Sequence, residues 1–491
     1  MNFNSYIFIF LFLPIVVWGW FFFNEKKKYN TAKYYLLTMS LIFYSYANVY
    51  YLFLIIFSIG FNYLTSHFFE SKFILKSNKI RVFLLFAAVS VNLGILFYFK
   101  YYNFFVENIN IVLDTSWTIK NIALPLGISF YTFQQISFIV DRYRKEAPHY
   151  KLIDYMLFVT YFPQLVAGPI VRHKDLITQF QNEELKKINW DNITKGFILF
   201  ILGLSKKMLL ADTLNLMVEY GYQNISTLDS ASLLLVALTY TFQIYFDFSG
   251  YSDMALGLAK MMNIELPINF NFPYKSKSIK EFWKRWHITL NEFLTQYVYI
   301  PLGGNKKGKL YTICNILIVF LLSGIWHGAN WTFILWGVLQ GIIIVVETLL
   351  NKKKKDNIIA WGITFALINL SWIIFRSDTL ETALLYYEKM FSFSWNGSIQ
   401  SLAYSLDNST VHFLLSLIKR ISGNLVPAFY MVYMLFILGA AIFFCRKGES
   451  HEFIRKYEIN SKSKLLWCLA ILFVLDVISL SNADVFLYVN F

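Results

Sequence analysis

Long apolar runs separated by short polar and basic stretches recur along the whole chain. Most of these runs are long enough to cross roughly 30 Å of hydrocarbon as a helix. In chain order, the runs expected to span a membrane are 6–23, 34–46, 49–69, 82–99, 122–140, 196–216, 233–249, 311–326, 331–349, 358–375, 429–444 and 465–480. The pattern therefore predicts an all-α, polytopic membrane protein with about ten to twelve transmembrane helices.

Two segments depart from this simple pattern. The run 156–170 is short and interrupted by Pro163, Gly168 and Pro169. This favours a re-entrant or interfacial segment over a full span, because broken backbone at membrane depth requires protein or water to satisfy it. In the segment 275–310, apolar residues recur at steps of three and four. These residues are Ile279, Phe282, Trp283, Trp286, Leu290, Phe293 and Tyr297. They predict one amphipathic helix lying at the cytoplasmic interface.

Basic residues give the predicted orientation. Lys26, Lys27 and Lys28 follow the first run, and no basic residue precedes it, which predicts a retained first helix with its N-terminus outside. Alternating the runs from that start places segment 275–310 and most of the Lys and Arg residues inside, as the positive-inside rule requires. The loop 376–427 and the C-terminus then lie outside. No repeat or soluble segment is evident, so residues 1–491 are expected to form one integral-membrane domain.

Composition narrows the class of protein. The chain is 57% hydrophobic and 15% charged, which excludes an ordinary soluble protein. A net charge of +14 would suggest nucleic acid in a soluble chain. Here it follows from the inner loops, so no nucleic-acid partner is predicted, and membrane lipids with anionic headgroups are the expected partners of these loops. The 3 cysteines are too widely spaced for a disulfide frame, and no metal site is predicted.

His327 is the strongest candidate for chemistry. It lies between two apolar runs in the sequence Trp326-His-Gly-Ala-Asn330, and basic residues flank the outer ends of the pair at Lys309 and at 352–355. An imidazole that titrates near neutrality is suited to act as a general base on a hydroxyl. The alternative is a histidine that only hydrogen-bonds between helices.

His287 is the second candidate. It stands at the edge of the apolar stripe of segment 275–310, which leads through Pro301 directly into the His327 hairpin. The simpler interpretation is that the whole stripe is an interfacial helix without a catalytic role.

Lys206 and Lys207 fall inside an apolar run, too deep for easy snorkelling. They are candidates for binding a phosphate of a nucleotide-like donor, or for pairing with Asp212 or Asp247, and structural pairing is the favoured interpretation. Asp247 and Asp253 are expected to mark a polar break in their run. Motifs for ATP hydrolysis, dinucleotide binding, zinc proteolysis and serine hydrolases are absent, and no bound cofactor is expected.

Several motifs, in order along nearly the whole chain, resemble the membrane-bound O-acyltransferase (MBOAT) family. Within that family the chain is most similar to the bacterial branch that contains the alginate O-acetylation, peptidoglycan O-acetylation and teichoic acid D-alanylation proteins. The motifs are Leu124-Pro-Leu-Gly-Ile-Ser-Phe-Tyr-Thr-Phe-Gln134, Tyr161-Phe-Pro-Gln-Leu-Val-Ala-Gly-Pro169, Phe246-Asp-Phe-Ser-Gly-Tyr-Ser-Asp253, the run 275–304 and Trp326-His-Gly328.

The resemblance implies a helical bundle around a central tunnel in a bacterial cytoplasmic membrane. His327 matches the family's catalytic histidine, and His287 matches a second histidine of this branch. The implied acyl donor is a cytoplasmic thioester, either acetyl-CoA or an acylated carrier protein, and the acceptor is an extracytoplasmic hydroxyl. Family members often work with an extracytoplasmic, esterase-like transferase partner.

Residue roles follow as predictions. The donor is expected to bind the basic residues Lys206, Lys207, Lys284 and Arg285. The expected donors to an oxyanion are Trp326 and Asn330, which neighbour His327, and Asp247 is a further substrate-contacting candidate.

Other functions stay open from the sequence. Within the family, the chain length favours the acetylating types over D-alanyl transfer to teichoic acid. Outside it, the broken runs and the intramembrane charges also suit a polysaccharide exporter or transporter, and a non-catalytic scaffold is the third alternative.

Overall fold

The computed structural model describes residues 1–71, 77–350, 358–407, 411, 415–416, 418–420, 422–456, 463–482 and 486. The basic run 352–355 and the last five residues lie outside this description. Within it the chain is helical, and the one extended pairing found there is a bridge between Phe270 and Trp286. Eight helices of the described part are long and apolar enough to cross a membrane. The all-α membrane fold is thus confirmed, and the count of ten to twelve spans stays a prediction.

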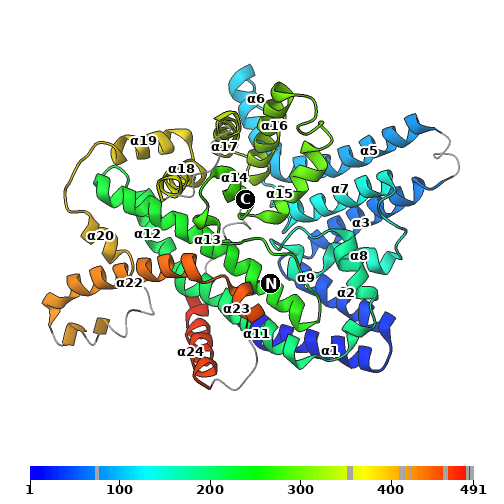
Figure 1. Cartoon of the computed structure of the whole chain (residues 1–491), viewed down its shortest axis with the longest axis horizontal. Coiled ribbons are helices and arrows are strands. Elements are labelled where there is room, and N and C mark those ends of the chain that lie inside the picture. Colours follow the sequence, from blue (N-terminus) through cyan, green and yellow to red (C-terminus); the bar gives the residue numbers. More distant parts are fainter. Residues whose placement is uncertain are drawn as a thin grey trace. The chain divides into compact units, whose positions relative to one another are not determined.

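The chain divides into two compact units. Unit 1 comprises Met1–Phe200, Met254–Ile268 and Glu292–Val298, and unit 2 comprises Ile201–Asp253, Asn269–Asn291 and Tyr299–Phe491. Figure 1 shows the helices of both. Both candidate catalytic histidines belong to unit 2.

Unit 1 contains most of the N-terminal helices. They are η1 (Phe8–Phe12), α1 (Leu13–Glu25), α2 (Tyr29–Ser45), α3 (Tyr50–Phe68), α5 (Asn78–Leu96), η2 (Phe97–Tyr101), α6 (Tyr102–Leu113), α7 (Ile128–Arg144), α8 (Leu152–Thr160), α9 (Phe162–Leu165), α10 (His173–Gln181), η3 (Glu184–Lys186) and the start of α11 (Trp190–Ser205). Phe8, Phe12, Phe43 and Phe162 pack together in its core, with ring centroids 5.5–6.2 Å apart.

Two sequence predictions in unit 1 can be compared with the structure. The predicted interruption of 156–170 is confirmed as a break between α8 and α9, with Pro163 in the first turn of α9. The buried residues on both sides of the break are enclosed by protein, as such backbone requires. The predicted run 82–99 was too short, because α5, η2 and α6 continue without interruption from Asn78 to Leu113.

Apart from η6 (Thr295–Tyr299), which lies mainly in unit 1, the other described helices belong to unit 2. They are η4 (Lys206–Ala211), α12 (Asp212–Gln223), α13 (Ser230–Met261, as far as Asp253), η5 (Pro273–Lys275), α14 (Ile279–Trp283), the start of α15 (Ile288–Leu294), α16 (Lys309–His327), α17 (Trp331–Leu350), α18 (Ile358–Arg376), α19 (Leu380–Met390), α20 (Ile399–Tyr404), η7 (Gly423–Leu425), α22 (Val426–Lys447), α23 (Ser450–Lys456), α24 (Ser463–Ser479) and η8 (Leu480–Asn482). Among its described residues, the predicted loop 376–427 therefore includes α19, α20 and η7.

Helix α13 corrects a second prediction. Asp247 and Asp253 were expected to mark a polar break within 245–253, but they lie inside a continuous helix of 32 residues. Lys207 and Lys206 form ion pairs with these two aspartates, each at 2.7 Å. A paired charge no longer has to reach water, so the helix continues through both positions.

Candidate active site

The hairpin of α16 and α17 fixes the position of His327. The two helices lie side by side (Figure 1) and cross where Gly324 faces Gly337. A Cβ on Gly324 would collide with the carbonyl oxygen of Phe333, and one on Gly337 with that of Phe320. Only glycine permits this approach of the two backbones. His327 follows Gly324 by three residues, so the close crossing sets where its ring lies.

The ring of His327 is enclosed by aromatic side chains. His327 is the last residue of α16 and is only 2% exposed. Its ring centroid lies 5.0 Å from that of Trp326, 5.2 Å from Trp336 and 5.3 Å from Phe375. These residues come from α16, α17 and α18, so three helices define one small environment.

His287 breaks the helix that the sequence predicted for segment 275–310. Residues 285–288 instead pair with 269–271 in an extended arrangement, in which Asn271 N–H donates to the Arg285 carbonyl and Ile288 N–H donates to the Asn269 carbonyl, both at 3.0 Å. His287 has a φ of 46°, a left-handed conformation that is unfavourable for a residue with a Cβ. Such strain persists where the surroundings fix it, often at functional sites.

The prediction of one interfacial helix is therefore wrong. The segment forms the short helices α14 and α15, and six of the seven stripe residues, all but Tyr297, are buried within the protein. Phe282, for example, stacks on Trp286 with ring centroids 5.5 Å apart. The periodic stripe marks packing against other helices, and the cytoplasmic location of the segment stays a prediction.

The two histidines meet at one indole. The His287 ring lies 5.9 Å from Trp326 and 4.8 Å from Phe248. His287 is 1% exposed, and this burial lowers its pKa to about 3, so the ring is neutral at physiological pH. We call His287, His327, Trp326, Phe248, Trp336 and Phe375 the histidine cluster.

Sequence reasoning missed the residues that support this cluster. Trp283 Nε1 donates to Gln340 Oε1 at 3.2 Å, and Gln340 Nε2 donates to Ser371 Oγ at 2.8 Å. Trp372 stacks on Trp336 at 5.7 Å and lies 5.2 Å from Trp286. Trp372 and Phe375 are three residues apart on α18, and this spacing on one helix face was the available signal.

Both the nitrogen and the oxygen of the Asn330 side-chain amide form hydrogen bonds to the backbone. Its Nδ2 donates to the Asp378 carbonyl at 2.7 Å, and its Oδ1 accepts from Thr332 N–H at 3.1 Å, at the start of α17. Asn330 therefore holds the beginning of α17, and these contacts do not bring it into the histidine cluster. Trp326 is the predicted oxyanion donor that the structure places between both histidines.

Lys206 and Lys207 are buried and ion-paired. Lys206 Nζ lies 2.7 Å from Asp253, and Lys207 Nζ lies 2.7 Å from both Asp212 and Asp247. We call these five residues the ion-pair cluster. Structural pairing, the interpretation that the sequence favoured, agrees with this geometry. The structure does not bring these lysines or Asp247 into the histidine cluster.

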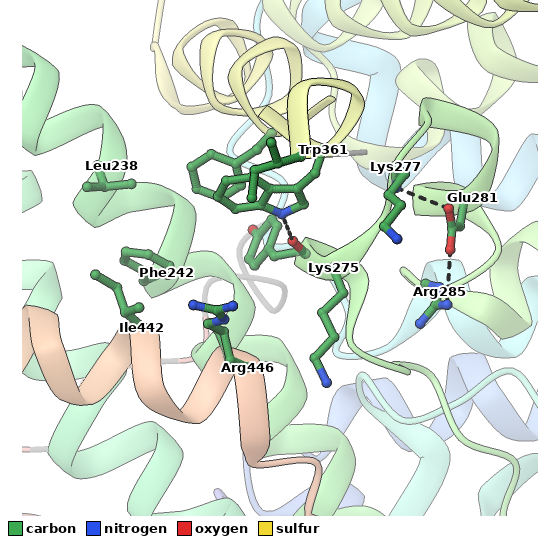
Figure 2. Close-up of a pocket in the computed structure, with 13 residues that line it drawn as sticks. Leu238, Phe242, Lys275, Lys277, Glu281, Arg285, Trp361, Ile442 and Arg446 are labelled. Atoms are coloured by element: carbon green, nitrogen blue, oxygen red, sulfur yellow. Dashed lines mark hydrogen bonds and ion pairs between the residues drawn. The ribbon is translucent and has the colours of Figure 1, made fainter. Parts of the chain in front are cut away.

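Lys284 and Arg285 lie at the end of α14. Lys284 is exposed, whereas Arg285 forms an ion pair with Glu281 at 3.0 Å. Arg285 and Glu281 also line a cavity of about 1000 Å³ that Figure 2 shows. Within the described residues, no group of three or more His, Cys, Asp or Glu side chains is arranged to hold a metal ion.

The geometry of the histidine cluster suits proton transfer. A neutral imidazole accepts a proton from a hydroxyl, and an indole N–H can donate to a developing negative oxygen. Helix α13 contributes Phe248, the segment between α14 and α15 contributes His287, and α16 contributes Trp326 and His327. The set therefore suits removal of a proton from an incoming hydroxyl.

Comparison with known proteins places these residues in context. The sequence profile of the MBOAT, membrane-bound O-acyltransferase family matches residues 115–387, which include both histidines. The chain is 36% identical over 531 aligned positions to the peptidoglycan O-acetyltransferase of Helicobacter pylori, covering 100% of the chain and 97% of that protein.

Two further relatives differ in how much they share. A probable alginate O-acetylase AlgI of Pseudomonas putida is 41% identical over 403 residues, covering 80% of the chain and 81% of the relative. A teichoic acid D-alanyltransferase of Streptococcus thermophilus is 30% identical over 247 residues, covering 47% of the chain and 58% of the relative.

Proposed function

The chain belongs to the membrane-bound O-acyltransferase family, and from this premise we propose that it moves an acetyl group from a cytoplasmic thioester to a hydroxyl of an extracytoplasmic polysaccharide. The chain is an acyltransferase and a multi-pass membrane protein. The transferred group, the donor, the direction of transfer and the acceptor are the proposed parts.

The observation that carries the proposal is the meeting of His287 and His327 at Trp326. In the proposed step, His327 accepts the proton of the attacking hydroxyl as its oxygen forms a bond to the thioester carbonyl carbon. Trp326 N–H donates to the carbonyl oxygen as it gains negative charge. The carbon–sulfur bond then breaks, and the proton held on His327 passes to the leaving thiolate, so that an ester and a neutral thiol result.

His287 is proposed to act on the donor side of Trp326. Its neutral ring provides one acceptor and one donor nitrogen without bringing a charge into the protein interior. His287 combines a left-handed backbone with ring contacts to Phe248 and Trp326.

Acetyl is the proposed group because of the relatives. The full-length similarity is to a protein named peptidoglycan O-acetyltransferase, whereas the teichoic acid D-alanyltransferase matches about half of the chain. Peptidoglycan is accordingly the first acceptor to test and an alginate-like polymer the second. D-alanyl transfer is the alternative within the family.

The donor and partner follow from the predicted orientation. We expect acetyl-CoA or an acylated carrier protein to approach from the basic inner side of a bacterial cytoplasmic membrane through the predicted central tunnel. Of the predicted basic residues, Lys284 is exposed near α14 and is the one proposed to meet donor phosphates, because Arg285 is already paired with Glu281. An extracytoplasmic, esterase-like transferase is the proposed partner that carries the acetyl group to the polymer.

A transporter is less well supported than it was from the sequence. The intramembrane charges that suggested it are Lys206, Lys207 and Asp247, and each is held in an ion pair of the ion-pair cluster. These charges therefore have a structural explanation.

The test is thiol release from acetyl-CoA by the purified full chain in liposomes, with peptidoglycan fragments as acceptor. His327→Ala should lower the rate by about 10² to 10⁴-fold, the usual contribution of a general base. His149→Ala, which removes an exposed histidine, is the matched control and should keep the rate. Unchanged thermal stability of both variants establishes folding. A His327→Ala protein with the full rate would remove the proposed role.

A further inference from the structure

The cavity in Figure 2 differs in chemistry from one wall to the other. Leu238 and Phe242 of α13 and Ile442 of α22 line one side, and the basic side chains lie toward the other (Figure 2). Helix α18 adds Ile358, Trp361 and Phe365. The volume of about 1000 Å³ is at the upper end for ligand sites in proteins.

Positive charge exceeds negative charge in the lining. Lys275, Lys277, Arg285 and Arg446 contribute four cations, and Glu281 contributes one carboxylate. Glu281 is already used: its Oε1 lies 3.0 Å from Arg285 and its Oε2 accepts from the Lys277 backbone N–H at 3.0 Å. Glu281 therefore offsets the charge of Arg285, and the lining keeps a net positive charge from Lys275, Lys277 and Arg446.

Lys275 and Arg446 also act on each other. Burial lowers the pKa of Lys275, the charges of Glu452 and Glu449 act against this, and the smaller effects of Arg285 and Arg446 lower the pKa again. An anion bound between Lys275 and Arg446 would relieve this repulsion.

Along the helices that line the cavity, the lining changes from apolar to basic residues. On α22, Ile442 and Arg446 are four residues apart, so the lining changes from apolar to basic within about 6 Å. Leu238 and Phe242 share a face of α13 by the same spacing. Both α13 and α22 are long and apolar enough to span a membrane, and basic residues at a helix end mark the headgroup level. The cavity thus extends from headgroup level toward the hydrocarbon.

The wall that faces α18 is held in place. Trp361 Nε1 donates to the Tyr274 carbonyl at 2.8 Å, a bond that Figure 2 marks. Tyr274 then packs on Phe282 and Trp286, with ring centroids 6.0 Å away in each case. Neither histidine of the histidine cluster lines the cavity. The cavity is therefore a separate site from the proposed reaction centre.

We infer that this cavity binds one anionic phospholipid, with its phosphate between Lys275 and Arg446 and an acyl chain along Leu238, Phe242 and Ile442. Basic pockets between transmembrane helices recognise anionic lipid headgroups in this way. A soluble phosphate compound would use the basic end but would leave the apolar wall uncovered. A phospholipid matches both the basic part and the apolar wall of the cavity, so it fits this site better than a nucleotide-like donor does.

The test is native mass spectrometry of the detergent-solubilised full chain, titrated with phosphatidylglycerol or phosphatidylcholine. The wild-type chain should retain one phosphatidylglycerol and bind phosphatidylcholine weakly. K275Q/R446Q should weaken phosphatidylglycerol binding by about thirtyfold, since each basic residue near a membrane surface contributes about fivefold. The matched control K309Q/K447Q removes two exposed basic residues outside the cavity and should bind as the wild type does.

A charge-preserving variant and two competing phosphate compounds test the lipid site further. K275R/R446K preserves the charges and should retain the lipid, which covers the case in which K275Q/R446Q fails to fold. Equal retention by K275Q/R446Q and the control would overturn the inference. Displacement of the lipid by glycerol phosphate or by coenzyme A would also overturn it, because the site would then belong to a soluble phosphate compound. His327→Ala should bind the lipid normally, so this test is independent of the proposed function.

Discussion

The ion-pair cluster and the histidine cluster are both buried groups of polar side chains in unit 2, but their surroundings differ. In the ion-pair cluster, each lysine lies 2.7 Å from a carboxylate, and Lys207 lies between two. In the histidine cluster, the rings of His287 and His327 lie against Phe and Trp side chains. The first region pairs buried opposite charges, and the second places two imidazole rings among aromatic residues.

This difference distinguishes buried groups that stabilise the fold from buried groups that can take part in a reaction. A buried charge that is matched by an opposite charge stabilises one arrangement of helices, and it changes little during a reaction. A neutral imidazole in an apolar setting can take up a proton for the lifetime of an intermediate and release it again. Position relative to the apolar runs of the sequence does not separate the two cases. Lys206, Lys207 and Asp247 lie within such runs, and His327 lies beside one.

The largest expected effect breaks the charge balance. Lys207→Met leaves Asp212 and Asp247 without their shared cation and should lower the free energy of unfolding by about 3–5 kcal/mol. Denaturant titration in detergent measures it. In the triple variant Lys207→Met/Asp212→Asn/Asp247→Asn no charge is left unbalanced, so much of the stability should return. If the single and triple variants are equally stable, the cluster is not held by charge balance.

The next effect concerns catalysis with little change in stability. His287→Asn removes the imidazole but keeps a residue that tolerates left-handed backbone. We expect about a hundredfold slower acetyl transfer and an unfolding free energy within about 1 kcal/mol of wild type. His287→Ala adds backbone strain and should be less stable than His287→Asn. Full activity in His287→Asn would assign His287 a purely structural role.

Local pattern predicted much of this architecture. The hairpin of α16 and α17 was expected at 311–326 and 331–349, and the helices end within two residues of those limits at each end. His327 was singled out because it is a titratable residue between two apolar runs. Such features depend on residues that are near each other in sequence.

Contacts between distant segments account for what the sequence did not predict. The break at His287 arises because residues 285–288 pair with 269–271, and a helical stripe cannot reveal that partner. The continuity of α13 through Asp247 depends on Lys207, forty residues away. Trp336 and Phe375 join the histidine cluster from two further helices. In each case, a nonlocal partner outweighs local periodicity.

A smaller effect tests how the histidine cluster is positioned. Gly324→Ala places a methyl group against the Phe333 carbonyl at the crossing of α16 and α17 and should lower stability by about 1–3 kcal/mol. Acetyl transfer should also fall, because His327 shifts with the end of α16. Gly362→Ala is the matched control: no atom lies within 4 Å of the added Cβ, and alanine in a helix should stabilise by up to about 1 kcal/mol. Equal behaviour of the two variants would contradict the close crossing.

The smallest effect is the pH dependence of stability that the neutral His287 implies. Burial lowers the pKa of His287 to about 3 in the folded protein, whereas an unfolded histidine titrates near about 6.5. Between these values the unfolded chain binds the extra proton, so stability is greatest above pH ~6.5 and falls as the pH decreases toward ~3. From pH ~6.5 to ~5.5 this one group should remove about 1 kcal/mol. Unfolding titrations of wild type and His287→Asn across this range isolate it, since the asparagine variant lacks the imidazole and should lose less stability. Parallel pH dependence in the two proteins would mean that the pKa of His287 is the same in the folded and the unfolded chain, which would contradict a ring kept neutral by burial.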